Sequence, residues 1–238
     1  MGHWFKTSFV FGSFKDDILE GGPGRDVIFG FFGNDVITAG AGSDRIFAGF
    51  GNDIVRTGQG NDYVHGGFGF DTVLYEGSVD DYEIVQKGHG RWSKTKVKTK
   101  DDTGAVVEVD TLRSVEAITF EADAYTLFLD GRNNAVLARG DTVSTEENTP
   151  LVINTAQLLA NDREFDGDTI EIVSVGPSAS GASVTLAGGQ ITYDQGTLFD
   201  GLQAGETTTD TFTYVVDDGF GGTVTVAVSV PPNPSSTT

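Results

Sequence analysis

The chain of 238 residues contains no cysteine, only 6 prolines, and 15 basic residues against 35 acidic ones. Without cysteine, disulfide bonds and thiolate chemistry are excluded. The shortage of proline beside 33 glycines predicts many tight turns rather than an extended linker. No hydrophobic run approaches the length of a membrane helix, so we expect no membrane insertion.

The formal net charge is −20, and the acidic residues are unevenly distributed. Residues 141–238 carry 14 acidic residues and 1 basic residue. A surface of this sign repels nucleic acid and anionic membranes, and it attracts cations. The same charge could equally serve solubility alone. The charge therefore predicts no nucleic-acid partner and leaves cation binding and solubility as alternatives.

Seven consecutive segments of nine residues occupy residues 12–74: GSFKDDILE, GGPGRDVIF, GFFGNDVIT, AGAGSDRIF, AGFGNDIVR, TGQGNDYVH and GGFGFDTVL. Position 4 is glycine in six of them, with Lys15 as the exception. Position 6 is always aspartate: Asp17, Asp26, Asp35, Asp44, Asp53, Asp62 and Asp71. Position 8 is always aliphatic: Leu19, Ile28, Ile37, Ile46, Val55, Val64 and Val73.

This repeat predicts half a coil of a β-solenoid. Glycine at positions 2 and 4 permits positive φ, so the first six residues should form a tight turn. The last three residues should form a short strand, whose middle side chain points into the core. Two repeats then make one coil of a two-sided parallel β-roll. Repeat n lies beside repeat n+2 at a strand spacing of roughly 4.8 Å.

The stacking predicts two columns of aspartates, in which Asp44 has a neighbour on each side and Asp71 ends its column. Two carboxylates about 5 Å apart repel by roughly 3 kcal/mol at an effective dielectric constant near 20. No basic residue recurs at a spacing that would neutralise them. A divalent cation between coils would replace this repulsion by ligation, and hard oxygen ligands select calcium over zinc or copper. A metal-free solenoid with aspartate-capped turns is the alternative.

The motifs resemble the RTX (hemolysin-type) calcium-binding nonapeptide repeat, G-G-x-G-x-D-x-U-x. The resemblance implies that the seven position-6 aspartates bind calcium together with main-chain carbonyls at positions 1 and 3. In the middle repeats those carbonyls belong to Gly21, Pro23, Gly30, Phe32, Ala39, Ala41, Ala48 and Phe50. Same-side aspartates eighteen residues apart imply about five calcium ions in the roll.

Residues 75–134 lose the ninefold period and are predicted to form an antiparallel, β-rich cap. DYEIVQK, RWSKTKVKTK and GAVVEVD alternate as strands do, with the turns GHG and DDTG between them. TLRSVEAITF then offers a buried set, Leu112, Val115, Ile118 and Phe120. The open end of a solenoid exposes strand edges and needs such a cap. The lysines of residues 94–100 could bind a polyanion, but we favour a solvated strand face that discourages edge pairing.

Residues 135–230 are predicted to form an antiparallel β-sandwich of cadherin/Ig-like type. Six short runs, PLVI, TIEIVSV, ASVTLA, QITYD, DTFTYVVDD and GTVTVAVSV, are separated by turn signals. TAQLLAND should form one helical turn, and FLDGRNNAVLARG should link the two domains. Residues 1–11 are expected to be a lead-in and residues 231–238 a proline-containing tail. DTVSTEENTPLVI, LLANDREFDGDTIEIVSV, QITYD and DTFTYVVDDGFGGTVTVAV resemble the cadherin-like tandem repeats of large bacterial surface proteins.

The stretch DREFDGD within this domain presents acidic residues at alternate positions and a glycine, as the opening of an EF-hand loop does. A strand is predicted to follow it instead of a helix. One reading is a single calcium site, and the other is an Asx-rich turn. The ligands of that site would be Asp162, Glu164, Asp166 and Asp168.

No catalytic constellation is evident, so we expect no enzyme. The three histidines, His3, His65 and His89, are not spaced as a triad or a metal site, and no phosphate-binding loop or nucleophile elbow occurs. The leading hypothesis is a calcium-dependent structural and adhesive segment of a secreted bacterial RTX surface protein. Its partners would be calcium and cell-surface or biofilm glycans or proteins. The alternative is a non-catalytic secretion and folding module of a larger RTX toxin or hydrolase.

The expected location is extracellular or at the bacterial cell surface. The segment MGHWFKTSFVF has too short an apolar core and no small-residue cleavage site, so it does not read as a signal peptide. We therefore expect export in one step, without an N-terminal signal peptide. The predicted fold as a whole is all-β: a parallel β-roll with an antiparallel cap, followed by a β-sandwich.

Overall fold

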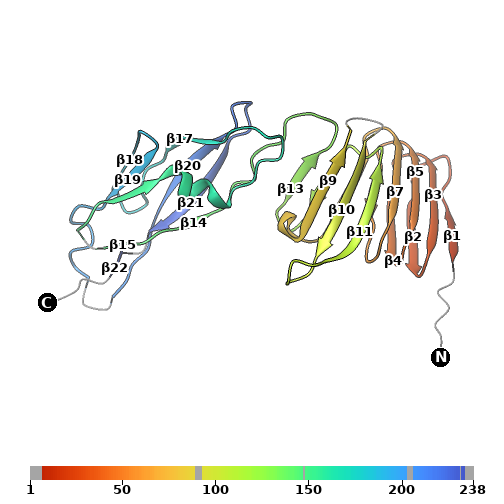
Figure 1. The fold of residues 1–238 in the computed structure, drawn as a ribbon, viewed down its shortest axis with the longest axis horizontal. Helices are drawn as coiled ribbons and strands as arrows, with labels where there is room; N and C mark the ends of the chain where they lie inside the picture. The colour runs from red at the N-terminus through yellow and green to blue at the C-terminus, as the bar shows by residue number, and fades with distance from the viewer. Residues whose placement is uncertain (1–6, 89–92, 147, 203–205, 231, 234–238) are drawn as a thin grey trace. The chain divides into compact units, whose positions relative to one another are not determined.

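A computed structural model describes residues 7–88, 93–146, 148–202, 206–230 and 232–233. The chain divides into two compact units, Met1–Arg132 and Asn133–Thr238, each of which is described by itself. The regular elements of both units are almost all strands (Figure 1), so the predicted all-β class is confirmed.

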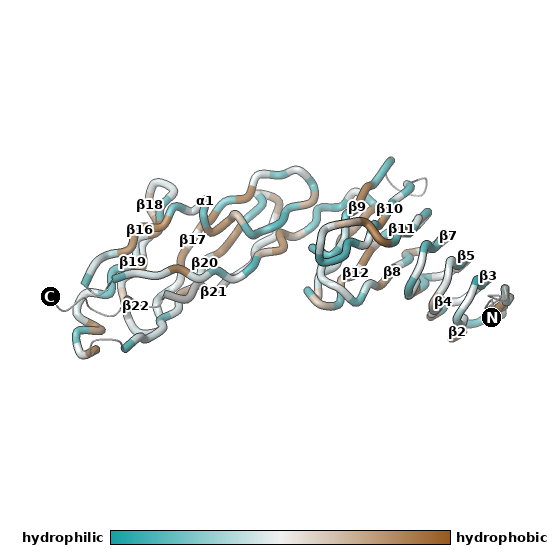
Figure 2. Tube along the Cα trace, turned by 60° about the horizontal axis from the view of Figure 1, so that its bottom comes forward, coloured by the Kyte–Doolittle hydropathy of each residue, from teal (hydrophilic) through white to brown (hydrophobic). Residues whose placement is uncertain are grey.

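The described residues of the first unit form two sheets, with strand orders β1-β3-β5-β7-β11-β10-β9 and β13-β12-β8-β6-β4-β2. The first sheet consists of β1 (Ser8–Phe11), β3 (Asp26–Phe32), β5 (Arg45–Phe50), β7 (Tyr63–Phe68), β11 (Val106–Arg113), β10 (Lys94–Lys100) and β9 (Tyr82–Lys87). The second consists of β13 (Tyr125–Phe128), β12 (Ala117–Phe120), β8 (Thr72–Tyr75), β6 (Ile54–Arg56), β4 (Val36–Ala41) and β2 (Ile18–Pro23). A 3-10 turn, η1 (Val79–Asp81), precedes β9. Figure 2 shows the successive coils, with β2 and β4 on one side and β3, β5 and β7 on the other.

The strands of residues 8–75 pair in parallel with a register of one coil. Ile28 lies opposite Ile46, and Ile37 lies opposite Val55, each eighteen residues further along the chain. All seven position-8 side chains are buried; Leu19 is 7% exposed and the others are at most 1% exposed. The predicted parallel β-roll with a thin aliphatic core is therefore confirmed.

Except for β6, the strands of the repeats are longer than the three residues predicted for each repeat. Strand β3 has 7 residues and runs into position 3 of the next repeat. Its ladder pairs Phe31 with Gly49 and Phe32 with Phe50. Because successive coils have turns of the same shape, part of the backbone of each turn also forms ladder hydrogen bonds with the turn of the neighbouring coil.

From the third repeat on, position 4 requires glycine because each turn packs tightly on the preceding coil. Gly60 has a φ of 125°, which side chains rarely adopt. A Cβ at this position would lie 1.5 Å from the carbonyl oxygen of Gly42, one coil earlier. The spacing between coils therefore excludes any side chain here.

The segment after the repeats continues both sheets and then turns back. Strand β11 pairs in parallel with β7, and β12 pairs in parallel with β8. Strands β10, β9 and β13 add antiparallel ladders. The predicted buried residues Leu112, Val115, Ile118 and Phe120 are at most 3% exposed. The predicted DDTG turn forms, with Asp101 accepting main-chain N–H bonds; the GHG turn falls mostly on residues 89–90, outside the described residues.

The second unit contains sheets of order β14-β21-β20-β17, β16-β19-β18 and β15-β22. Their strands are β14 (Asp141–Thr142), β15 (Thr145–Glu146), β16 (Leu151–Asn154), β17 (Glu171–Val175), β18 (Ser183–Ala187), β19 (Gln190–Asp194), β20 (Asp210–Asp217), β21 (Val224–Val230) and β22 (Pro232–Asn233). All six predicted runs form strands. TAQLLAND forms α1 (Thr155–Leu158) and η3 (Leu159–Asn161), as expected. The core packs Ile153, Ile191, Tyr193, Phe212 and Tyr214.

Three peripheral predictions need correction. Ser8–Phe11 of the predicted lead-in form β1, which adds a strand to the roll. Val136 lies within the predicted sandwich bounds of 135–230 and is 2% exposed in the sandwich core, so only the prediction that it belongs to a linker is wrong. Pro232–Asn233, in the predicted tail, form β22 at an edge, where proline is tolerated because its missing N–H is not needed. Residue 231, residues 234–238 and residues 1–6 lie outside the described residues.

Candidate metal sites

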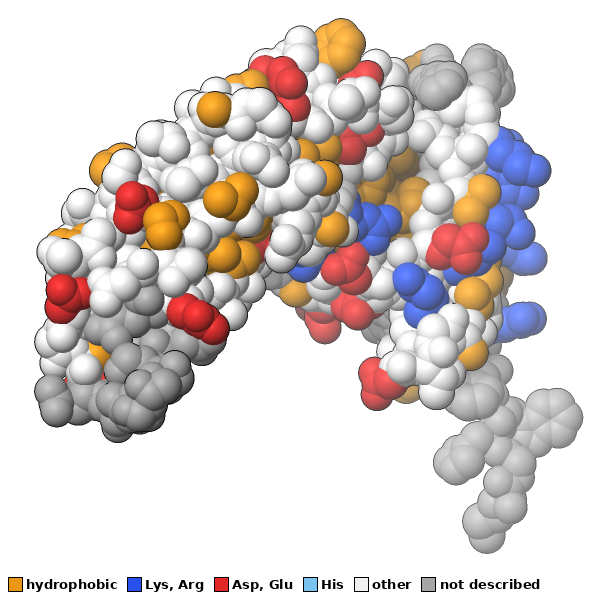
Figure 3. All heavy atoms as spheres, turned by 60° about the vertical axis from the view of Figure 1, so that its left-hand side comes forward, with side chains coloured by type: hydrophobic (Ala, Val, Ile, Leu, Met, Phe, Trp, Pro, Cys, Tyr) orange, Lys and Arg blue, Asp and Glu red, His pale blue; other side chains and the backbone are white. Residues whose placement is uncertain are grey.

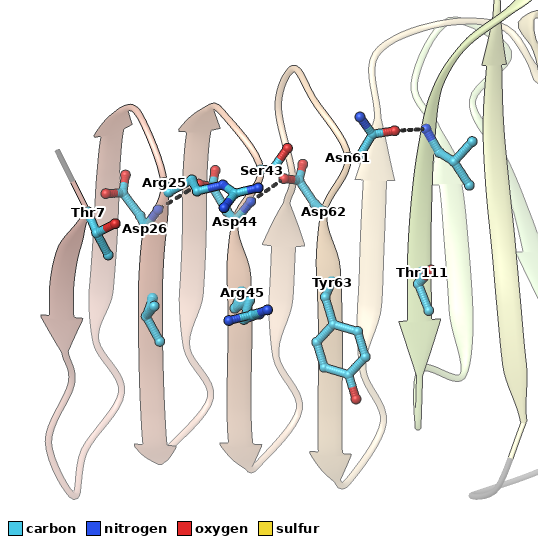
Figure 4. A pocket seen from close by; sticks show the side chains of 12 residues that line it. Thr7, Arg25, Asp26, Ser43, Asp44, Arg45, Asn61, Asp62, Tyr63 and Thr111 are labelled. Atoms are coloured by element: carbon cyan, nitrogen blue, oxygen red, sulfur yellow. Dashed lines mark hydrogen bonds between the residues drawn. The ribbon is translucent and has the colours of Figure 1, made fainter. Parts of the chain in front are cut away.

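The position-6 aspartates form two ladders along the turns of the roll. Oδ1 of each aspartate one coil further on accepts the main-chain N–H of the aspartate eighteen residues earlier, at 2.7 to 3.0 Å. Figure 4 shows these bonds from Asp26 to Asp44 and from Asp44 to Asp62. We call the two rows the Asp17 ladder (Asp17, Asp35, Asp53, Asp71) and the Asp26 ladder (Asp26, Asp44, Asp62).

The second oxygen of five ladder carboxylates is buried without a hydrogen-bond partner. These are the Oδ2 atoms of Asp35, Asp44, Asp53, Asp62 and Asp71. Each of these residues is at most 3% exposed. The ion pairs found among the described residues join other groups, so no basic side chain neutralises the ladders. A buried, unsatisfied carboxylate oxygen is unfavourable unless a cation binds it. The donor set therefore fits a hard divalent cation.

With protein groups alone, the carboxyl groups of Asp53, Asp62 and Asp71 resist ionisation. Burial, chiefly, raises the pKa of Asp53 to about 6, of Asp71 to about 7 and of Asp62 to about 8. Nearby negative charges add to each shift, Asp110 among them for Asp62. The N–H bond to each Oδ1 lowers the pKa without offsetting burial. A bound cation would favour the ionised form.

Position-1 carbonyl groups converge on the same carboxylates. The point at which a Cβ of Gly30 would lie is 2.2 Å from the Ala48 carbonyl oxygen and 2.3 Å from Asp35 Oδ2. At Gly21 the corresponding distances are 2.1 Å to the Ala39 oxygen and 2.8 Å to the Oδ2 of Asp26. A side chain at either glycine would fill the space between the two oxygens.

The predicted position-3 carbonyls take part in the ladders between coils. The Ala41 oxygen accepts the Gly24 N–H at 2.6 Å, and the Phe50 oxygen accepts the Gly33 N–H at 2.9 Å. A carbonyl oxygen has two lone pairs, so each retains capacity for a second partner. The role of the carbonyl oxygens at positions 1 and 3 as calcium ligands stays a prediction.

A groove of 390 Å³ follows the Asp26 ladder (Figure 4). Arg25, Asp44, Asp62 and Val109 are among its lining residues. The three carboxylates drawn in Figure 4 lie in one row along the turns. The groove is open to solvent and gives a cation access to this ladder.

The cap supplies two further acidic residues to the ladders. Asp110 Oδ1 accepts the N–H of Asp62 at 2.9 Å, and Glu116 Oε2 accepts the N–H of Asp71 at 2.8 Å. The expectation that Asp71 ends its column was therefore wrong, because Glu116 follows it. The sequence separations are 48 and 45 residues, since a hairpin is inserted before them. No fixed period marks either residue, so the repeat pattern gave no signal for them.

In the second unit, Glu164, Asp166 and Asp168 each place a carboxylate oxygen within 4.8 Å of the others. The Glu164 carboxylate accepts the N–H groups of Asp166 and Asp168 at 2.6 and 2.8 Å. Asp166 Oδ1 accepts Asn134 Nδ2–H at 2.9 Å. The loop thus gathers negative charge as a cation site would, and it also satisfies its own donors as a turn does.

Asp162, the fourth predicted ligand of that loop, lies outside this group of three. Its Oδ1 accepts the Arg139 N–H at 2.7 Å, and its Oδ2 is buried without a partner.

Asp218, in a different loop, accepts the N–H groups of Phe220 and Gly222 in the turn that follows it. Burial and then the neighbouring carboxylates, Asp218 included, raise the pKa of Asp168.

The lysine-rich strand β10 has the character of a solvated face. Its intervening side chains Thr95 and Val97 are 1% exposed, so the lysines point to the opposite side. Lys98 forms an ion pair of 2.7 Å with Glu83. Figure 3 shows basic side chains gathered on one face of the molecule. These features agree with the interpretation favoured from the sequence.

Within the described residues, no helix has the length and apolar character needed to cross a membrane.

Each of the two units matches the model of a known protein family. Residues 11–46 and 38–73 match the RTX calcium-binding nonapeptide repeat (4 copies), and residues 133–231 match a bacterial Ig domain. The predicted combination of RTX repeats and a cadherin/Ig-like sandwich is confirmed. RTX repeats bind calcium in general, and both families are typically structural modules without catalytic activity. The chain therefore carries a calcium-binding structural module.

Solved structures with similarity include the extracellular lipase LipA from Serratia marcescens, at a TM-score of 0.34 and 14% identity. That match covers 60% of this chain and 22% of the lipase chain, so this chain spans about a fifth of the lipase's length. The AlgE6R3 subunit of the Azotobacter vinelandii mannuronan C5-epimerase matches at a TM-score of 0.25 and 22% identity, over 43% of this chain and 72% of that subunit. No curated protein sequence matches the chain.

Proposed function

We propose, from the RTX calcium-binding nonapeptide repeats of residues 11–73 and the bacterial Ig domain of residues 133–231, that the chain is a calcium-dependent structural and adhesive segment of a secreted bacterial surface protein. The roll is the calcium-dependent part, and the sandwich is a spacer with its own core. The partners are calcium and cell-surface or biofilm glycans or proteins outside the cell.

The observation that carries this proposal is the set of five buried Oδ2 atoms without partners. In the proposal the position-6 carboxylates bind about five calcium ions between successive coils, with the position-1 and position-3 carbonyls completing the shells. Calcium suits the site better than magnesium, because it accepts more ligands and more flexible geometry.

Bound calcium would decide whether the roll is folded. Its core contains one large aliphatic side chain per nine residues, which is thin against the cost of ordering the backbone. With a dissociation constant of about 0.1 mM, each site adds roughly 1.4 kcal/mol at about 1 mM calcium, and five sites add roughly 7 kcal/mol. A domain's net stability is about 5–15 kcal/mol. At micromolar calcium the gain almost vanishes, which would keep the roll extended before export.

A calcium titration of the full chain tests the proposal. Circular dichroism and limited proteolysis should show residues 12–74 gaining sheet content and protease resistance as calcium rises to millimolar concentration. Magnesium at the same concentration is the control and should have a smaller effect. A roll that keeps its sheet signal and protease resistance in excess chelator would overturn the calcium-dependent part.

The adhesive part needs its own measurement. Beads coated with the full chain should bind bacterial surface or biofilm material in calcium and release it in chelator. Equal retention on uncoated beads would remove adhesion from the proposal and leave the structural role.

A further inference from the structure

We infer that the cap completes one more calcium site than the repeats provide, in which Glu116 and the Ser114 carbonyl group face Asp71. This inference rests on the proposed calcium-binding function. It concerns the end of the Asp17 ladder, where the chain no longer follows the nonapeptide pattern.

The segment from Ser114 to Glu116 reproduces the oxygen arrangement of a repeat. The point at which a Cβ of Gly66 would lie is 2.1 Å from the Ser114 carbonyl oxygen and 2.4 Å from Asp71 Oδ2. These distances match those at Gly30, where the carbonyl belongs to the next coil. The Ser114 oxygen thus occupies the place of a position-1 carbonyl. Ser114 adopts a φ of 48°, an uncommon conformation for a residue other than glycine.

Glu116 occupies the place of the next aspartate in the ladder. Its Oε2 accepts the Asp71 N–H at 2.8 Å, as each Oδ1 does within the repeats. Its half-buried carboxylate carries a second oxygen, Oε1, which adds to the charge beside Asp71.

An unpartnered atom independently points to a ligand at this place. Asp71 is 1% exposed, and its Oδ2 has no hydrogen-bond partner. The same atom lies beside the Ser114 carbonyl oxygen, in a space that only glycine at position 66 leaves open. A hard cation would be held there by a carbonyl oxygen and two carboxylates, which is the ligand chemistry of calcium.

The Asp26 ladder ends differently. Asp110 Oδ1 accepts the N–H of Asp62, and Asp110 Oδ2 accepts the hydroxyl of Tyr75 at 2.9 Å. Both carboxylate oxygens are thereby engaged by protein donors, and Tyr75 is 7% exposed. Asp62 Oδ2 is also buried without a partner, but Asp110 already uses both of its oxygens for protein donors. The additional site is therefore placed at the end of the Asp17 ladder. The extra ion would tie the cap to the last coil, so that both fold together.

The test counts calcium ions bound per full-length chain, by equilibrium dialysis and by isothermal titration. Glu116→Gln removes the charge but keeps an oxygen that can accept the Asp71 N–H. The matched control is Glu121→Gln, the same change in the same cap, where Glu121 pairs with Arg56 instead. We expect Glu116→Gln to bind one ion fewer than the wild type and Glu121→Gln to bind the same number.

A second pair of variants decides the matter if Glu116→Gln fails to fold. Asp53→Asn and Asp71→Asn both keep an acceptor for the preceding N–H. If Glu116 completes a site, Asp71 serves two sites and the two variants lose equal numbers of ions. If Asp71 is the last ligand, Asp71→Asn loses fewer ions, and the inference is overturned.

The outcomes separate this inference from the proposed function. A wild-type chain that binds no calcium overturns the proposed function and the inference together. A wild-type chain that binds calcium, with an unchanged ion count in a folded Glu116→Gln variant, overturns the inference alone.

Discussion

Oδ1 of Asp53 accepts the main-chain N–H of Asp35 at 2.8 Å, while the Oδ2 of the same carboxylate is buried without a partner. One oxygen thus supports the backbone of the neighbouring coil, and the other remains for a cation. The first role requires only an acceptor, whereas the second requires negative charge. The two roles can therefore be separated by substitution.

Asp53→Asn should keep the backbone bond and lose calcium affinity. We expect affinity at the neighbouring sites to fall at least about tenfold, because a charged ligand is replaced by a neutral one. Asp53→Ala should in addition lose about 1 kcal/mol of stability for the lost hydrogen bond. Calorimetry and urea unfolding in saturating calcium measure the two effects. Equal calcium affinity for Asp53→Asn and wild type would contradict the assignment of Asp53 as a ligand.

A row of stacked phenylalanines should stabilise the folded roll. The ring centroid of Phe50 lies 4.9 Å from that of Phe32 and 4.5 Å from that of Phe68. Each aromatic pair contributes about 0.5–1.5 kcal/mol beyond area burial, so Phe50→Ala should cost about 1–3 kcal/mol. Phe14→Ala is the control, because Phe14 has one stacked neighbour in this row and is 83% exposed. Urea unfolding in saturating calcium measures both; equal losses would show that stacking is not the cause.

The repeat period was sufficient to predict the roll, because it fixes the register as well as the strands. Ile28 and Ile46 lie opposite each other since eighteen residues return the chain to the same place. The strand ends were not predictable from one repeat, because pairing between Phe32 and Phe50 depends on the neighbouring coil. The core position of Val136 depends likewise on contacts distant in sequence.

The candidate metal sites also include residues that the sequence predicted and residues that it did not. The aspartate columns follow from the period, so the sequence predicted which carboxylates lie side by side. Asp110 and Glu116 join those columns only after the chain has formed a hairpin of unpredictable length. In the sandwich, alternation predicted the approach of Glu164, Asp166 and Asp168. It could not show that Asp162 instead accepts a bond from Arg139.

The loop of the sandwich can be tested without disturbing the roll. Asp166→Asn in the full chain should bind one calcium ion fewer at millimolar calcium if the loop is a site. The sandwich should stay folded, because its core of Ile191, Tyr193 and Phe212 lies elsewhere. Glu171→Gln, an exposed change in β17, is the charge-matched control. An unchanged ion count for Asp166→Asn would identify the loop as a turn alone.

The roll without calcium should become more folded as the pH falls. The folded state raises the pKa of Asp53 to about 6, of Asp71 to about 7 and of Asp62 to about 8, chiefly through burial. An unfolded aspartate has a pKa of about 3.9. Between these values the folded state binds more protons, so stability is present at low pH and is lost as the pH rises towards 8. Protons and calcium thus compete for the same oxygens, and calcium affinity should rise over this range.

Circular dichroism in calcium-free buffer at pH 5 and pH 8 measures this dependence. The sheet signal and the protease resistance of residues 12–74 should both be greater at pH 5. Asp62→Asn should flatten the pH response, because the side chain with the largest of the three shifts no longer titrates. Glu121→Gln, at a group whose pKa is lowered by Arg56, should not flatten it. A metal-free roll that is more folded at pH 8 than at pH 5 would contradict this prediction. It would show that the ladder carboxylates ionise freely, and hence that they are not buried as the structure shows.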